Sequence, residues 1–469
     1  MKKPIQDLNI GYELLHPASI IATHCHYQRT VIRGRENLPK DGAYIIAPCH
    51  QNALMEPMAM LAVLPSRIVF LARADIFQKP AARAFLTFLK ILPVYRIRDG
   101  KSSLAKNEEI FAKSKQVLLS RVPLCLMAEG RHNDRHQLLP LVKGMFRIAG
   151  ETQRELGDTP LYIVPTGIDF DHYEHPYSNL VINIGKPIPV QPFMEQFEAD
   201  EPVALNQMRE RLAVALKQQM HHVESKENYE EVYALCHILN RSWRKRKHRC
   251  NTAWNRFITR CEIAQHFNKS TNQQINKSTL NPSNNSTTQQ LNPQPLQLSR
   301  TYLDICQRLH LDLHAATDPW HPLWTLTATA AVAAAVTATA LFQPVREALL
   351  WILLCNPLIL IPTHLLVKKL IKDPQFRSSV NYGIRLVLSL LYTIVITVVM
   401  CCTRGIGWGA LALATAVAVA RANAIIHPFL RRWLQNLQRG WLHLTHRSDM
   451  RQLRQLEKAL IDDSVKNDR

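Results

Sequence analysis

The sequence predicts an α/β domain with a largely parallel sheet covered by helices, followed by a C-terminal membrane domain of four transmembrane helices. In the N-terminal half, short apolar runs alternate with longer helix-like stretches, which is typical of a parallel sheet with crossover helices. In the last third, apolar residues gather into long uncharged runs that approach the length needed to cross a bilayer. The 469 residues are enough for about three domains.

Six apolar runs of strand length predict the sheet of the first domain, which we place at residues 1–235. They are AYIIAP (43–48), RIVFLA (67–72), LPVYRI (92–97), PLCLMA (123–128), LYIVPTGI (161–168) and NLVINIG (179–185). Ligands of parallel sheets bind at the carboxyl ends of the strands. The residues that follow each run are therefore the first candidates for a functional site.

Four apolar segments predict the membrane domain, which we place at residues 301–427. They are Leu323–Phe342, Ala348–Val367, Leu386–Cys402 and the shorter Ile406–Ala420. The loop between the second and third segments holds four cationic residues between positions 368 and 377, whereas the other two connections hold one each. By the positive-inside rule we expect an inner (cytoplasmic) membrane protein, with the first domain and the basic tail (428–469) on the cytoplasmic side. A buried helical hairpin domain is the alternative.

Two further segments lie between these domains. A helical segment (236–267) contains the basic stretch RSWRKRKHR, which suits an anionic membrane surface, with a solvated helix face as the alternative. Residues 268–300 are nearly all Asn, Gln, Ser, Thr and Pro, so we expect a disordered linker there. The net charge of +20 favours anionic partners. We expect no nucleic acid among them, because no nucleic-acid-binding motif accompanies the charge.

The first strand run leads into PCHQNALMEP, which places His50 at a strand end and Glu56 in the first turns of the next helix. Asn52 is expected to cap that helix. The strand-to-helix turn lets Glu56 fold back toward His50, and a carboxylate on one ring nitrogen leaves the other as a general base. A loop histidine with a structural role is the alternative. Cys49 is a poor nucleophile candidate, since neighbouring side chains on a strand point to opposite faces.

Three more groups of polar residues follow later strands. The segment LPVYRIRDG (92–100) contains Arg96, and VPTGIDF (164–170) contains Pro165. Between them, MAEGRHNDRHQLLPLVKG (127–144) contains Glu129, Gly130, Arg131, Arg135 and Lys143. We expect no metal site, because the ten cysteines include no CxxC pair and the His- and Asp-rich segment 169–175 has no established ligand spacing.

In this order, the four groups resemble the conserved blocks of the glycerolipid acyltransferase family that includes lysophosphatidic acid acyltransferase (PlsC-like). The resemblance covers about residues 30–190 and implies acyl transfer from acyl-CoA or acyl-ACP, as co-substrate, to the hydroxyl of a glycerophospholipid acceptor, with no metal, cofactor or covalent intermediate. It implies that His50 deprotonates the acceptor hydroxyl and that Glu56 orients His50. A helix N-terminus beside His50 is expected to supply donors for the oxyanion.

The resemblance also implies binding roles. Arg96 is expected to hold the acceptor phosphate, with Arg131, Arg135 and Lys143 as further candidates. Glu129 and Gly130 are expected to shape the acceptor site, and Pro165 to lie near the acyl chain. Two positions depart from the usual pattern, because the acid of the first block stands at 56 instead of 55, and His132 takes the place of an arginine in the third block.

The favoured reaction is acylation of 1-acyl-glycerol-3-phosphate to phosphatidic acid. Glycerol 3-phosphate or a lyso aminolipid as acceptor is the alternative within the class. The alternative from another class is a non-catalytic membrane scaffold that binds anionic lipid through the basic segment.

Overall fold

A computed structural model describes residues 4–64, 67–95, 102–173, 177–280, 293–317, 324–331 and 374–466, together with residues 334, 367, 369 and 371. The chain divides into two compact units. Unit 1 comprises Met1–Met220 and Thr363–Tyr392, and unit 2 comprises His221–Pro362 and Thr393–Arg469. Helix α15 (Pro374–Arg404) therefore begins in unit 1 and ends in unit 2.

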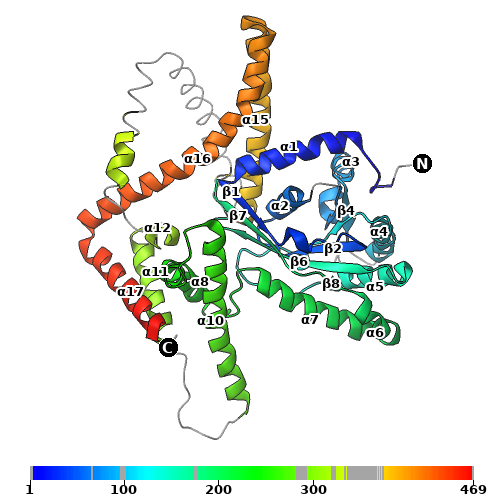
Figure 1. Cartoon of the computed structure of the whole chain (residues 1–469), viewed down its shortest axis with the longest axis horizontal. Coiled ribbons are helices and arrows are strands. Elements are labelled where there is room, and N and C mark those ends of the chain that lie inside the picture. Colours follow the sequence, from blue (N-terminus) through cyan, green and yellow to red (C-terminus); the bar gives the residue numbers. More distant parts are fainter. Residues whose placement is uncertain are drawn as a thin grey trace. The chain divides into compact units, whose positions relative to one another are not determined.

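Unit 1 is built around one eight-stranded sheet (Figure 1). Its strands are β1 (Arg29–Arg33), β2 (Ala43–Pro48), β3 (Val69–Arg73), β4 (Ile91–Val94), β5 (Leu124–Cys125), β6 (Leu161–Phe170), β7 (Asn179–Ile184) and β8 (Ile188–Pro189). The order is β1-β7-β6-β2-β5-β3-β4, with β8 on β6. Only β7 and β8 pair with β6 in antiparallel fashion among the described strands. The prediction of a largely parallel sheet is confirmed, and all six predicted runs contain a strand.

Helices cover both faces of this sheet. Figure 1 shows α5, α6 and α7 on one side of it and α1 and α2 on the other. The helices of unit 1 are α1 (Ile10–His26), α2 (Met55–Val63), α3 (Pro80–Phe88), α4 (Ser102–Leu119), α5 (Gly144–Leu156), α6 (Met194–Ala199), α7 (Glu201–Gln219) and the first turns of α15; its 3-10 turns are η1 (Arg35–Asn37), η2 (Ala74–Phe77) and η4 (Gln191–Phe193).

The alternation of side chains along β2 builds one core on each face. Ala43, Ile45 and Ala47 pack into the cluster that contains α4, α5 and α7. Ile46 points the other way, into the cluster that contains α2 and, from α15, Tyr382. Central strands buried on both faces read as continuous apolar runs, which is why β2 and β6 are visible in the sequence.

Unit 2 is helical in its described part. Its helices are α8 (Tyr229–Ile238), α9 (Asn240–Arg246), α10 (Ala253–Leu280), α11 (Pro293–Arg308), α12 (Leu313–Thr317), the end of α15, α16 (Ile406–Thr445) and α17 (Arg447–Lys466). Its core is formed mainly by α8, α10, α11 and α17. The predicted basic tail (428–469) thus contains the end of α16 and the whole of α17.

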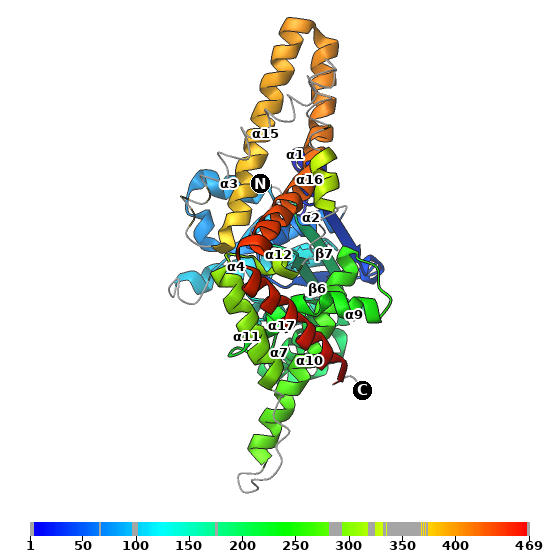
Figure 2. The ribbon, with the colours of Figure 1, turned by 90° about the vertical axis from the view of Figure 1, so that its left-hand side faces the viewer.

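The four predicted spans have different outcomes. Within α15, Phe376–Arg404 is long and apolar enough to cross a membrane, and it contains the predicted span Leu386–Cys402. Figure 2 shows α15 as one unbroken helix along this stretch. Of the first predicted span, the structure describes residues 324–331 and 334, which are helical, and of the second it describes only Val367. The fourth, Ile406–Ala420, lies in α16, where side chains 414–420 are outside the described set.

The middle of the chain contains more helix than we predicted. Helix occupies both ends of the predicted disordered linker (268–300), because α10 continues to Leu280 and α11 begins at Pro293. Buried side chains of α11, from Ser299 to Cys306, dock this helix into the core of unit 2, and that packing outweighs the polar composition. In the basic segment (236–267), Trp243 is buried in the same core and is not available to a membrane surface.

Candidate active site

His50 lies where the central strand β2 leaves the carboxyl edge of the sheet. Strand β2 pairs with β6 up to Pro48 and Thr166, and the next amide, that of Cys49, still donates to the Thr166 carbonyl at 3.0 Å. The chain then turns toward α2. The side chain of His50 is 15% exposed, so its ring borders the core and remains accessible.

Glu56, the second residue of α2, folds back onto His50 as the sequence led us to expect. Its Oε2 lies 3.3 Å from Nδ1 of His50, without the alignment of a hydrogen bond. Its Oε1 accepts the backbone N–H of Gln51 at 2.9 Å and that of Asn52. The carboxylate is fully buried, and these two N–H groups fix its position. One oxygen of Glu56 therefore holds the turn, while the other faces the imidazole.

The turn between His50 and Glu56 differs from the expectation in two ways. Asn52 does not cap α2 with its side chain; its Nδ2 donates to the Tyr173 carbonyl at 3.4 Å, and Glu56 bonds the free amides instead. The amides of Gln51 and Asn52 are thereby occupied, so they are not the oxyanion donors that we expected from this helix terminus. Ala53 has a φ of +44°, a left-handed conformation that an alanine adopts at an energetic cost.

Cys49 follows the last residue of β2 and packs into the cluster that contains Ile46 and α2. Its Sγ lies against the backbone of Ile168, and the side chain is fully buried. Burial, with Glu129 nearby, raises the pKa of this thiol well above its ordinary value. A protonated, inaccessible thiol is not a nucleophile.

Glu129 binds the backbone of the His50 strand end. Its Oε1 accepts the His50 N–H and its Oε2 accepts the Leu139 N–H, both at 2.8 Å. The Asn133 amide completes the contact by donating to the His50 carbonyl at 3.1 Å. Burial raises the pKa of Glu129 to about 7, although both backbone donors oppose the shift. Glu129 thus clamps the loop 129–139 to the histidine.

Gly130 begins this loop in the left-handed conformation, with a φ of +63°. A Cβ on this residue would approach Cγ1 of Val142 to 2.8 Å. Any larger residue is therefore disfavoured both by the backbone and by Val142. Gly130 thus lets the chain turn, and its amide donates to the Met127 carbonyl at 3.0 Å.

The predicted substrate-binding residues lie in three different environments. Arg131, Arg135 and Lys143 are exposed in the chain segment that follows Glu129. Pro165 is buried in β6 opposite Ala47, and its carbonyl accepts the Gly185 amide at 2.8 Å. Arg96 lies outside the described residues.

The sequence did not reveal the aromatic contacts around His50. The ring of His132, which stands in place of the expected arginine, meets the His50 ring edge to face, with 5.5 Å between ring centroids. Phe376, from the first turn of α15, meets His132 in the same way at 4.8 Å. No sequence pattern linked Phe376 to this site, because it belongs to a segment read as membrane domain.

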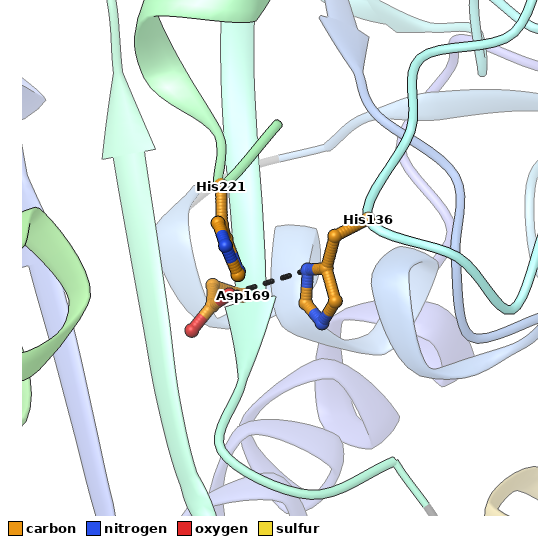
Figure 3. Close-up of side chains that lie close together, drawn as sticks. All are labelled: His136, Asp169 and His221. Carbon is orange, nitrogen blue, oxygen red and sulfur yellow. Dashed lines mark ion pairs between the residues drawn. The ribbon is translucent and has the colours of Figure 1, made fainter. Parts of the chain in front are cut away.

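A second histidine–carboxylate pair lies in unit 1. Figure 3 shows the ring of His136 facing Asp169 on β6, with Nδ1 of the histidine 3.8 Å from Oδ1 of the acid. Both side chains are buried. The Tyr173 hydroxyl contacts Nε2 of His136 at 3.0 Å and donates to Oε1 of Gln51 at 2.8 Å. Tyr173 therefore links this pair to Gln51, the residue that follows His50.

Part of the chain matches a described protein family. Residues 29–169 match the family model described as Acyltransferase, and this range contains His50, Glu56 and Glu129. Among solved structures, the chain is similar to the 1-acyl-sn-glycerophosphate (LPA) acyltransferase PlsC of Thermotoga maritima, at 19% identity and a TM-score of 0.28, over 40% of this chain and 72% of that chain. No curated protein matches the chain.

Proposed function

We propose that the chain, whose residues 29–169 match the acyltransferase family model, transfers a fatty acyl group from acyl-CoA or acyl-ACP to the free hydroxyl of 1-acyl-glycerol-3-phosphate, giving phosphatidic acid. The observation that supports the proposal most directly is the His50–Glu56 contact at the carboxyl end of a central strand. The histidine is accessible, whereas its carboxylate partner is buried and held by backbone amides.

The proposed chemistry uses His50 as a general base. With Nδ1 facing Glu56, Nε2 takes the proton of the acceptor hydroxyl while the hydroxyl oxygen attacks the thioester carbonyl. The new C–O bond forms, the C–S bond breaks, and the imidazolium returns its proton to the leaving thiolate. Glu56 keeps the ring oriented and stabilises its charged form. The thioester is already activated, so no side-chain nucleophile is required.

We assign binding of the acceptor phosphate to cationic residues of the predicted site. Arg131, Arg135 and Lys143 follow Glu129 in the chain, and Glu129 bonds the backbone of His50. A phosphate held by these cations would place a glycerol hydroxyl near the site. Arg96 completes the proposed set.

The substrates are lipids, and α15 offers a membrane attachment. Its stretch Phe376–Arg404 is long and apolar enough to cross a bilayer. We propose that the protein resides in the inner membrane with its acyltransferase domain on the cytoplasmic side, where the chain's positive charge favours an anionic surface.

The test is an acyl-transfer assay with the purified full-length chain in detergent or lipid nanodiscs. Acyl-CoA and acyl-ACP are each offered with 1-acyl-glycerol-3-phosphate, glycerol 3-phosphate or a lyso aminolipid, and the lipid products are identified by mass spectrometry. We expect phosphatidic acid as the main product. A preference for glycerol 3-phosphate or for the lyso aminolipid would replace the acceptor, and no product with any pair would reject the enzyme.

A further inference from the structure

Within unit 1, the first turns of α15 lie against the turn that joins His50 to Glu56. The Oγ of Ser379 accepts the backbone N–H of Leu54 at 3.0 Å, although the two residues are 325 positions apart in the chain. Ser379 is buried, and Tyr382, one turn further along α15, packs into the core beside Met55 and Met60 of α2. The helix is thus a structural part of the acyltransferase domain.

The position of this hydrogen bond matters because the Leu54 amide directly follows the left-handed residue of the turn. Leu54 is the N-cap of α2, and its own side chain makes no capping hydrogen bond. Ala53, the residue before it, is held at a φ of +44°. A left-handed alanine persists only where the surroundings enforce it. The Ser379 hydroxyl supplies such a restraint, together with the Met55 amide that donates to the Asn52 carbonyl at 2.8 Å.

The same turn determines where Glu56 lies. The amides of Gln51 and Asn52 donate to Oε1 of Glu56, which presents the other oxygen to His50 at 3.3 Å. If the turn relaxes, these amides move, and the carboxylate moves with them. The Ser379 hydroxyl is therefore linked to the geometry of the proposed base. The link runs through the backbone amides of Leu54, Asn52 and Gln51.

We propose that Ser379 is a positioning residue for acyl transfer: its hydroxyl holds the Leu54 amide, fixes the turn and thereby keeps Glu56 against His50. This inference rests on the proposed function. It also assigns α15 two tasks, because the helix that holds the turn is the one whose length and composition suit a membrane span.

The experiment compares three single variants of the full-length chain. Ser379→Ala removes the acceptor oxygen, and Ser379→Thr keeps it. Ser378→Ala is the matched control, because Ser378 is equally buried on the same helix. We expect Ser379→Ala to lower kcat about tenfold, which corresponds to one lost hydrogen bond, with KM values for both substrates within about twofold. Ser379→Thr should restore at least about half of the activity, and Ser378→Ala should match the wild type within about twofold.

A double-mutant cycle separates positioning from a general loss of structure. If Ser379 acts through Glu56, Ser379→Ala should have little further effect on kcat in a Glu56→Gln background. The positioning role would be overturned if Ser379→Ala lowered kcat by the same factor in both backgrounds. It would also be overturned if Ser378→Ala lowered kcat as much as Ser379→Ala does. An inactive wild type would instead reject the proposed function and this inference with it, so the two failures are distinguishable.

Discussion

Two histidine–carboxylate pairs in unit 1 have similar composition and different surroundings. His50 and Glu56 are 3.3 Å apart, and the histidine is 15% exposed. His136 and Asp169 are 3.8 Å apart, with both side chains 4% exposed or less. The first pair stands at a strand end, whereas the second is buried and in contact with the Tyr173 hydroxyl. A histidine beside an acid is therefore a catalytic candidate only where a substrate can reach the ring.

The largest effect is expected for His50→Ala. We expect kcat to fall by about 10² to 10⁴, because proton transfer by a positioned base contributes that much. The measurement is steady-state acyl transfer, with the thermal unfolding midpoint of the same preparation as the control for folding.

Membrane association provides a second readout for the same variant. A non-catalytic lipid-binding scaffold would keep both its lipid binding and its cellular role after this substitution. An enzyme would keep its membrane association and lose its product. Retention of more than about a tenth of wild-type kcat would contradict the assignment of His50 as the base.

Glu129 is a buried acid that binds the backbone of His50 and not its ring. Its pKa of about 7 lies above the usual 4.5, so the native state retains a proton that the unfolded chain releases. The free energy of unfolding should therefore fall as the pH rises from about 4.5 to 7, by about 3 kcal/mol at 1.36 kcal/mol per pKa unit.

Glu129→Gln has no such proton, so its stability should lack this decline. The test compares unfolding free energies of the two proteins at pH 5 and pH 8, with the exposed Glu108→Gln as control. The same pH dependence in Glu129→Gln and in the wild type would show that another group is responsible.

The sheet was predictable because buried central strands carry continuous apolar sequences. The run AYIIAP coincides with β2, and the long run at 161–168 lies within β6. Strand β1 escaped notice because RTVIR places arginines at both ends of a short, partly exposed edge strand. Strand β8 has only two residues and no pattern of its own.

The site was predictable where its residues are close in sequence. His50 and Glu56 are six positions apart, and one turn brings them together. His132 and His136 were within a quoted motif, but their partners come from elsewhere: Phe376 from α15 and Asp169 from β6. Such contacts depend on tertiary packing, and neither periodicity nor spacing in one sequence encodes it.

The smallest effect on catalysis is expected for His136→Ala. In His136→Ala, Tyr173 loses a hydrogen-bonding partner and the buried carboxylate of Asp169 loses a neighbouring imidazole. We expect the free energy of unfolding to fall by about 1–3 kcal/mol, the usual cost of removing a buried polar partner. The kcat should fall less than about tenfold, because Tyr173 still contacts Gln51, beside His50.

The measurements are denaturant unfolding and acyl transfer on the same preparations of His136→Ala and His50→Ala. The two variants should show opposite patterns: His50→Ala loses activity with little change in stability, and His136→Ala loses stability with most of its activity. A loss of 10²-fold or more in kcat for His136→Ala, at an unchanged unfolding free energy, would exchange the roles of the two pairs. Burial of His136 argues against that exchange, because a hydroxyl of the acceptor would have to displace Tyr173 to reach its ring.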